Sequence, residues 1–353
     1  MSLSSLERTA VCVLLAAALA GCATTPPASG PVERGTADVV YAGSLVGLVQ
    51  SKLQPGFEKA TGDSFVGKGA GSLSLAEGIL DGELSPGAFV SVGAKPIERL
   101  WPSRSKFSIS LATDPLVVAF ASTSRYAAQL QEISSGKAPL SQLFSLFERP
   151  GFRIGRTDPN ADPQGQFFIL MCKLAESELG LPKATADKVL GITASKPSGS
   201  ASQIFDETAL DPQISAGNVD AGSAYLSQAL QYHLDYIVLP AGLNFAVPAK
   251  VGVYKKASLR LTNGTVVTGG LITLDDTLVL PATGSTRSTA DERADEAWLS
   301  FLLSRTGRSL LEHSGYSLTT PELSLVHPGA VGTEVPPSVR SALIRAGGRT
   351  ATP

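Results

Sequence analysis

The sequence has no excess of positive or negative charge, and it has no long apolar run. Its 353 residues carry 29 Lys and Arg against 31 Asp and Glu. A chain this close to neutral has no basic excess that would attract a polyanion, so nucleic acid is not an expected partner. Hydrophobic residues still make up 43% of the chain and charged residues only 17%. This balance excludes a disordered chain and indicates a globular protein.

Cysteine and histidine are also scarce, with three residues of each type. No CxxC pair or His-rich spacing suggests a metal site. Cys172 ends the apolar segment 167–172, where a small buried hydrophobic residue is the ordinary interpretation. We therefore expect no cofactor, no site for a free metal cation and no internal disulfide.

The N-terminal residues carry a targeting signal. An apolar run covers residues 10–20, which is about half of the roughly 20 residues needed to span a bilayer but suits a secretory leader. The ending Leu19-Ala20-Gly21-Cys22 is similar to a bacterial lipobox. We predict a lipoprotein signal peptide over 1–21, a flexible tether over 22–36, and lipidation of Cys22 that anchors the protein extracytoplasmically at the membrane. The alternative is an ordinary signal peptide followed by a chance cysteine.

Strand-like and helix-like segments alternate along the chain, which is typical of an α/β fold. Residues 37–324 carry this pattern and are long enough for two cores. Residues 325–353 are rich in Pro, Gly, Ser, Thr and Ala. A short helix fits 338–346, but the flanking Pro and Gly residues predict a disordered tail. We expect strands near 38–42, 88–92, 116–120 and 152–155, and helices near 45–53, 73–80, 165–179 and 290–313.

Four short polar segments stand where the chain enters a predicted helix. Helix N-termini present unpaired N–H groups and a partial positive charge, so several that converge can hold an oxyanion without Lys or Arg. Each serine alone is explained as well by helix capping, so the prediction depends on the joint pattern. The segments are Gly43-Ser44, Gly71-Ser72, Pro163-Gln164-Gly165 and Ala224-Tyr225.

The longer segments around these positions resemble a known family. They are Tyr41–Leu45, Gly71–Ala76, Gly155–Gly165 and Gly217–Tyr225. In this order and spacing they resemble the molybdate/tungstate-binding lipoproteins of ABC transporters, within the periplasmic-type solute-binding proteins. The resemblance covers about residues 38–320. The segment Gly155–Gly165 is the most specific of the four and matches the tungstate-type branch.

The resemblance implies an α/β, two-lobed periplasmic-binding-protein fold of type II, with the ligand in the interlobe cleft and two hinge crossings. We place lobe one at 37–114 and 239–324 and lobe two at 115–238. The crossings are expected near Thr113-Asp114-Pro115 and Leu239-Pro240. It also implies a non-enzymatic monomer that delivers its ligand to the permease and ATPase subunits of an ABC importer.

The resemblance also implies the ligand-binding residues. Ser44 and Ser72 would donate hydrogen bonds from lobe one, and Asp162 and Tyr225 would contact the anion from lobe two. Within the same motif, two further residues are interpreted as structuring the loop rather than binding, namely Arg156 and Asp158.

The Asp162 carboxylate would repel a dianion bound beside it, so this repulsion has to be compensated. It can be protonated and donate a hydrogen bond, or its oxygen can coordinate the metal centre of the oxyanion. In tungstate-type relatives this aspartate and a glutamate coordinate the metal, and the glutamate position here is Ala224. We therefore expect a tetrahedral oxyanion, molybdate or tungstate, held mainly by neutral donors. Whether Asp162 is an additional ligand stays open at this point.

Other functions are compatible with parts of the sequence. The same fold could bind sulfate, phosphate, a ferric–anion complex or a small organic acid, although few tyrosines or arginines lie in the candidate loops. A secreted lipoprotein hydrolase is a different class, but the chain has no GxSxG or HExxH motif. A sensor or scaffold lipoprotein is the third class. The histidines are expected to be non-catalytic, namely His233, His313 and His327.

Overall fold

The computed structural model describes residues 33–350, apart from 283, 285–286 and 328–329. The predicted signal peptide, Cys22 and most of the predicted tether lie outside the described residues. The end of that tether is already part of the fold, since the Gly35 amide donates to Asp63 Oδ1 at 2.9 Å. Residues 34–353 form one compact unit. Within the described part of the chain, no helix has both the length and the apolar character needed to cross a membrane.

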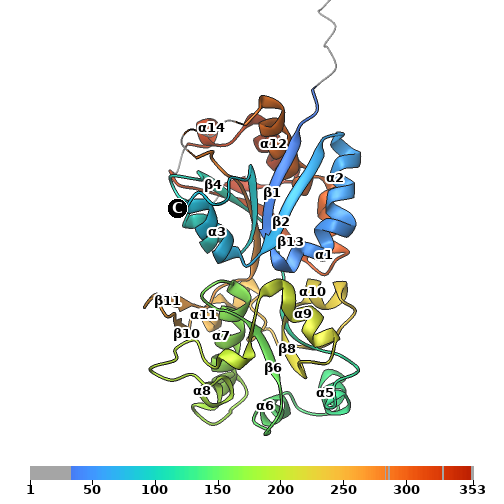
Figure 1. Cartoon of the computed structure of the whole chain (residues 1–353), viewed down its shortest axis with the longest axis vertical. Helices are drawn as coiled ribbons and strands as arrows, with labels where there is room; N and C mark the ends of the chain where they lie inside the picture. The colour runs from blue at the N-terminus through green and yellow to red at the C-terminus, as the bar shows by residue number, and fades with distance from the viewer. Residues whose placement is uncertain (1–32, 283, 285–286, 328–329, 351–353) are drawn as a thin grey trace, which may run out of the picture. The chain divides into compact units, whose positions relative to one another are not determined.

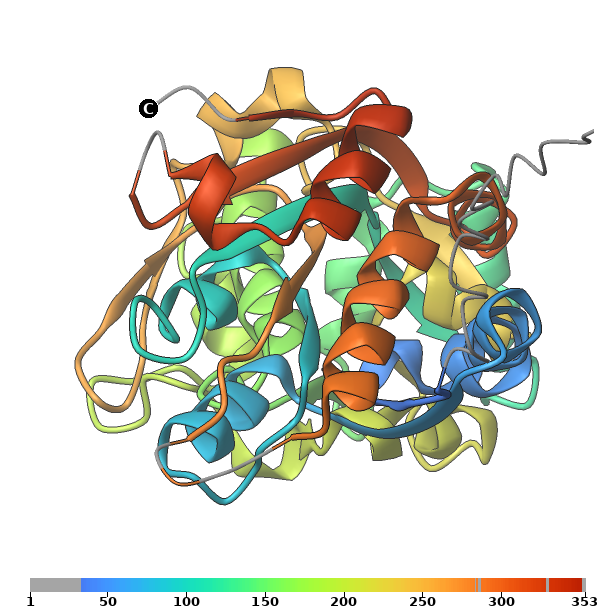
Figure 2. The same cartoon turned by 90° about the horizontal axis from the view of Figure 1, so that it is seen from above.

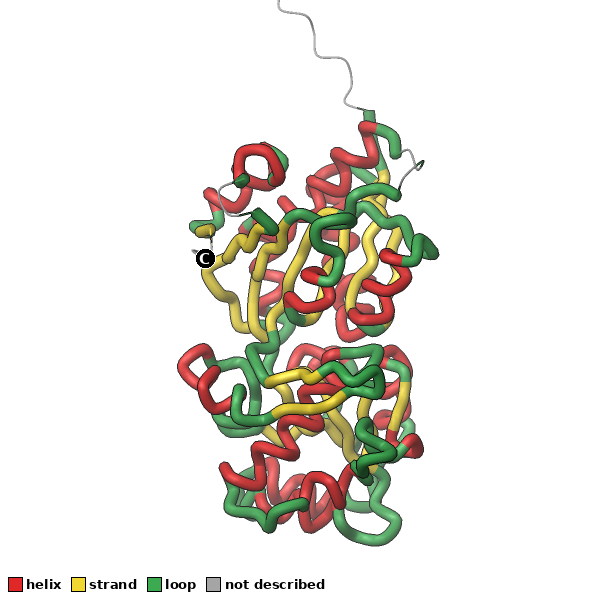
Figure 3. The backbone as a smooth tube through the Cα atoms, turned by 90° about the vertical axis from the view of Figure 1, so that its left-hand side faces the viewer, coloured by secondary structure: helices red, strands yellow, loops and turns green. Residues whose placement is uncertain are grey.

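Two sheets organise this unit, and we call the parts built on them lobe one and lobe two (Figures 1 and 3). In the described residues, the lobe-one sheet has seven strands in the order β14-β13-β4-β12-β3-β1-β2. The two strands beside β1 run parallel to it, whereas β12 and β13 pair antiparallel with β4. The bounds are β1 Thr36–Ala42, β2 Ser64–Ala70, β3 Ala88–Val92, β4 Phe107–Thr113, β12 Thr273–Leu278, β13 Ser317–Leu325 and β14 Arg349–Thr350.

Helices cover the lobe-one sheet, and those near 45–53, 73–80 and 290–313 lie where the sequence pattern predicts them. Strand β3 is buried along its whole length, and Trp298 of α12 packs against Phe57 of α2 at 5.6 Å between ring centroids. The helical elements are η1 Gly43–Leu45, α1 Val46–Leu48, η2 Val49–Leu53, α2 Gln54–Thr61, α3 Ser72–Leu80, α4 Ala94–Glu98, α12 Thr289–Leu303, α13 Arg305–Glu312, α14 Val331–Glu334 and α15 Pro337–Arg345.

The lobe-two sheet has the order β7-β6-β8-β5-β9, and a separate hairpin joins β10 to β11. Most residues of its long helix α7 are buried, including Cys172 as expected for a small core residue. The strands are β5 Leu116–Phe120, β6 Ile154–Thr157, β7 Ile204–Phe205, β8 Ala221–Tyr225, β9 Asp235–Val238, β10 Ser258–Arg260 and β11 Val266–Thr268. The helical elements are α5 Ala127–Ser134, α6 Ser141–Phe147, α7 Pro163–Glu178, α8 Thr185–Leu190, η3 Ala201–Gln203, α9 Glu207–Ser215, α10 Leu226–Gln231, η4 Pro248–Lys250 and α11 Val251–Tyr254.

The chain crosses between the lobes at 113–116, near the predicted position, but the second crossing predicted at Leu239-Pro240 is wrong. After β9 the chain remains with lobe two, where Phe245 packs on Phe167 of α7 at 5.1 Å and Thr262 donates its amide to Asn160. The return to lobe one is at 271–273, beside the first crossing. The apolar residues after Pro240 hold this segment on α7, so the proline marks the end of a strand and not the exit from the lobe.

The described part of the C-terminal tail forms secondary structure that packs on lobe one, contrary to the sequence prediction. Helix α15 lies against α12 (Figure 2), with Val339 and Leu343 buried, and β14 extends the sheet beside β13. Pro337 begins the helix and Gly347, with φ of 73°, follows its end. The prolines and glycines that suggested disorder are therefore the start and stop signals of a helix.

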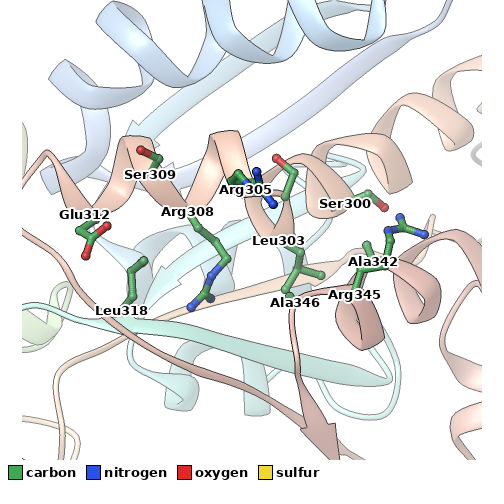
Figure 4. Close-up of a pocket in the computed structure, with 11 residues that line it drawn as sticks. Ser300, Leu303, Arg305, Arg308, Ser309, Glu312, Leu318, Ala342, Arg345 and Ala346 are labelled. Carbon is green, nitrogen blue, oxygen red and sulfur yellow. The ribbon is translucent and has the colours of Figure 1, made fainter.

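The ordered tail also closes one side of a cavity on lobe one. The cavity has a volume of about 800 Å³ and lies between α12, α13, β13 and α15 (Figure 4). Its lining includes Arg305 and Arg308 from α13 and Arg345 from α15. The Arg308 guanidinium donates a hydrogen bond to the Thr319 carbonyl at 2.9 Å, which links α13 to β13.

Candidate functional site

Ser44 lies in η1, at the end of the buried strand β1. Its side chain is buried, and within the described residues its Oγ has no hydrogen-bond partner. It does not cap a helix, since η1 has no side-chain cap. The hydroxyl group makes no hydrogen bond of standard geometry, but it lies close enough to the Glu207 carboxyl to lower the pKa of that group.

Ser72 begins α3, directly after β2, and it is fully buried. Its Oγ accepts the Val92 amide at 3.2 Å, which leaves the hydroxyl proton for another partner. The same turn contacts lobe two, because the Ser74 amide donates to the Ala161 carbonyl at 3.2 Å. A Cβ at Gly71 would lie 2.6 Å from that carbonyl oxygen, so only glycine allows this approach.

Asp162, next to Ala161, is the N-cap of α7. Its Oδ1 accepts the Gln164 amide at 3.1 Å, while its Oδ2 is buried and has no partner among the described residues. Burial raises the pKa of this carboxyl to about 6. One oxygen therefore stabilises the helix, and the other makes no hydrogen bond of standard geometry, although the Thr157 hydroxyl lies close enough to the carboxyl to lower its pKa.

Tyr225 ends β8 at the entry to α10. Its amide donates to Gln228 Oε1 at 2.9 Å, and its buried hydroxyl has no partner in the described part of the chain. Burial and then the charges of Asp162 and Glu207 hold the pKa of the phenol well above its usual range. Tyr225 is thus a neutral hydrogen-bond donor.

Glu207 lies among these residues and was not predicted from the sequence. It is the first residue of α9 and is buried, and its two carboxylate oxygens accept the amides of Gly43 and Ser44 at 2.7 and 2.9 Å. Burial and the charge of Asp162 raise its pKa well above the usual range. An acidic residue in the first turn of a helix is ordinary, so the sequence pattern offered no signal for this role.

Two more buried carboxyl groups, Asp114 and Asp211, lie near these residues. Asp114 Oδ1 accepts the Ser227 amide at 3.2 Å, and Asp211 Oδ2 accepts from Gln228 Nε2 at 2.9 Å. Burial raises the pKa of each to about 7. In the part of the chain that the structure describes, neither they nor Asp162 and Glu207 form an ion pair with Lys or Arg.

Ala224 stands at the position where the tungstate-type branch has a glutamate. Its side chain is fully buried in an apolar cluster with Val117, Leu210 and Ile214, on the face of β8 that packs against α9. Adjacent residues of a strand face opposite sides, so Tyr225 points the other way. The second carboxylate of this region comes from Glu207 on α9 and not from β8.

The predicted loop residues have the structural contacts expected of them. Arg156 is fully buried and donates to the carbonyl of Ser198, and Asp158 Oδ1 accepts the Asn160 amide at 2.9 Å. Burial lowers the pKa of Arg156 to about 10. Both residues therefore shape the loop that leads to Asp162.

The site combines neutral donors from both lobes with several carboxyl groups. Its amides and hydroxyl groups suit an anion with several oxygens, since such an anion accepts many hydrogen bonds at once. Within the described residues, no three His, Cys, Asp or Glu side chains gather as ligands for a metal cation.

Residues 37–317 match the family model of bacterial extracellular solute-binding proteins. The chain belongs to this family. As a solute-binding protein it is extracytoplasmic, and both the resemblance noted in the sequence and the two-lobed α/β fold are confirmed.

Relatives of this solute-binding protein carry names that state a ligand. A molybdenum-binding protein of an ABC transporter from Haloferax volcanii is 29% identical over 307 residues, covering 87% of each chain. A molybdate/tungstate-binding protein from Pyrococcus abyssi is 27% identical over 237 residues, covering 63% of this chain and 65% of its own. The periplasmic molybdate-binding protein of Azotobacter vinelandii has a similar fold, with a TM-score of 0.50 and 18% identity over 80% of this chain and 99% of its own.

Proposed function

We propose that this solute-binding protein captures a tetrahedral metal oxyanion, molybdate or tungstate, and delivers it to the permease and ATPase subunits of an ABC importer. The observation that carries the proposal is the group of buried, unpartnered polar atoms supplied by both lobes. They are Ser44 Oγ, Asp162 Oδ2 and Tyr225 Oη. Buried polar groups normally have partners, so their convergence supports a polar ligand between the lobes. The names of the relatives support the choice of oxyanion.

The proposed binding mode uses neutral donors. The Ser44 and Tyr225 hydroxyl groups and the Gly43 and Ser44 amides donate to the anion, and Ser72 adds its hydroxyl proton. Such donors hold a dianion without a countercharge when they are fixed in advance. Asp162 Oδ2 then either contacts the metal centre of the oxyanion or, when protonated, donates a hydrogen bond to it.

Isothermal titration calorimetry tests the ligand class. Molybdate and tungstate should bind the purified protein more tightly than sulfate, which is smaller and reaches fewer donors in the same cleft. Phosphate should also bind more weakly, because its remaining proton faces a site made mostly of donors. Heat with sulfate or phosphate but none with molybdate or tungstate would assign the same fold to another anion, and turnover of a chromogenic ester would replace transport with hydrolysis.

We further propose that the protein acts as a monomer without a cofactor and is anchored by lipidation of Cys22. The lipobox-like segment supports the anchor. Expression with Cys22→Ala should move the protein from the membrane fraction to the soluble fraction. Retention of that variant at the membrane would show that another element provides the anchor.

A further inference from the structure

Two backbone amides of lobe one, from Gly43 and Ser44, donate to one carboxylate of lobe two, that of Glu207. These are the same amides that the proposed function assigns to the oxyanion. We propose that Glu207 is an internal competitor for the oxyanion and thereby sets the affinity and selectivity of the site. This inference rests on the proposed function.

The geometry imitates anion binding. Each carboxylate oxygen accepts one of two consecutive amides, at 2.7 and 2.9 Å, where β1 ends and η1 begins. Two adjacent oxygens of a tetrahedral oxyanion would meet the same pair of N–H groups in the same way. A carboxylate and an oxyanion cannot both occupy these amides, so the ligand has to displace Glu207.

The local chain is built for this contact. A Cβ at Gly43 would lie 2.7 Å from Glu207 Oε2, so glycine is needed for the carboxylate to approach. Glu207 is 4% exposed and leaves its aqueous environment to reach the amides. Burying a carboxylate is costly unless hydrogen bonds compensate, and the two amides provide that compensation.

Displacement has a consequence for selectivity. An anion that offers no more than a carboxylate gains nothing by replacing Glu207. A dianion that also reaches Ser44 Oγ and Tyr225 Oη makes additional hydrogen bonds and can displace it. Glu207 therefore lowers the affinity of the site for monoanions such as acetate and formate.

Calorimetry on Glu207→Gln tests the competition. Glutamine has one acceptor oxygen, and its NH2 group would face an N–H donor, so it competes poorly for the two amides. We expect sodium molybdate to bind the variant about tenfold more tightly than it binds the wild type, because the two amide hydrogen bonds that Glu207 accepts no longer have to be broken. The matched control is Asp206→Asn, one residue earlier and exposed, which should bind as the wild type does. Equal or weaker binding by Glu207→Gln would overturn the proposal, and weaker binding would make Glu207 a ligand of the oxyanion instead.

A second measurement does not depend on the ligand. Because Glu207 joins the two lobes, its loss should loosen their contact in the absence of oxyanion. Small-angle X-ray scattering should give a larger radius of gyration for Glu207→Gln and for Gly43→Ala than for wild type and Asp206→Asn. Gly43→Ala displaces the carboxylate from the other side, so it replaces the first variant if that one folds poorly. Unchanged scattering for both variants would overturn the interlobe contact.

The two measurements separate failure of this inference from failure of the proposed function. If the wild type binds neither molybdate nor tungstate, the proposed function fails while the scattering still tests the contact of Glu207 with lobe one. If the wild type binds molybdate and Glu207→Gln does not bind it more tightly, only the competition fails.

Discussion

Ser44 and Ser72 both stand at the start of a helical segment, but their hydroxyl groups have different surroundings. Ser72 Oγ accepts the Val92 amide, whereas Ser44 Oγ has no partner among the described residues. Helix capping, the simpler explanation of both residues, applies to neither. The two serines should therefore contribute differently to binding and stability.

Ser44→Ala should weaken molybdate binding by about 1–3 kcal/mol, because a hydrogen bond to a charged acceptor is lost. The stability of the protein should change little, since no intramolecular hydrogen bond of this Oγ is broken. Titration calorimetry measures the first effect and urea unfolding the second. Ser51→Ala is the control, because Ser51 is exposed and its hydroxyl donates to the Gly47 carbonyl one helical turn earlier. Equal affinity of both variants would remove Ser44 from the site.

Asp162 combines a structural contact with a free oxygen. Asp162→Asn should leave the free energy of unfolding nearly unchanged, because asparagine caps a helix about as well as aspartate. Asp162→Ala should lower it by about 1 kcal/mol, because the Gln164 amide loses its acceptor. Urea denaturation of the three proteins measures this. If the alanine variant is as stable as the asparagine variant, the cap does not stabilise α7.

At the scale of elements, strands and helices with a clear period were predicted well. The runs at 88–92 and 116–120 are the fully buried strands β3 and β5. The errors concern which elements pack together. Leu239-Pro240 resembles a lobe boundary in the sequence, but long-range contacts with α7 decide otherwise. The hydrophobic period of a segment indicates whether that segment is a helix or a strand. Which other element the segment packs against depends on residues distant in the sequence.

Helix α15 illustrates the same limit and allows a test. Leu343 is 4% exposed, while the adjacent Ile344 is 70% exposed. Leu343→Ala should destabilise the protein by about 2–4 kcal/mol through lost burial and a cavity. Ile344→Ala, the matched control, should change stability by less than about 0.5 kcal/mol. Similar midpoints for the two variants in urea unfolding would mean that α15 contributes little to the stability of lobe one.

At the scale of the whole molecule, the candidate site was predictable only in part. Gly-Ser turns after strands are visible in a sequence, and the structure places Ser44 next to a carboxylate of the other lobe. Glu207 was not predictable, since its partners are about 160 residues away and it sits at an ordinary helix start. Sites between lobes depend on how the lobes meet, and no local pattern encodes that.

The buried carboxyl groups give the molecule an unusual pH dependence. Burial raises the pKa of Asp114, Asp211, Asp275 and Asp295 to about 7 and that of Asp162 to about 6. Burial also raises the pKa of Glu207 and that of Asp276 well above the usual range. Asp220 and Asp291 shift the opposite way, because they gain hydrogen bonds from Arg153 and from Thr36 and Ser288 respectively. The groups with raised pKa outnumber those with lowered pKa, so the folded state retains more protons than the unfolded state between about pH 4 and 7.

Because each raised carboxyl binds its proton more tightly when folded, its stabilising effect is complete below the unfolded pKa of about 4 and disappears as the pH rises through the folded value. The free energy of unfolding should therefore fall from pH 5 to pH 8, by roughly 1–3 kcal/mol for each such group. Urea unfolding at several pH values measures this slope. Asp114→Asn should flatten it, since asparagine accepts the Ser227 amide without titrating, whereas Asp206→Asn at an exposed position should leave it unchanged. A stability that rises over this range would show that these carboxyl groups stay ionised in the fold.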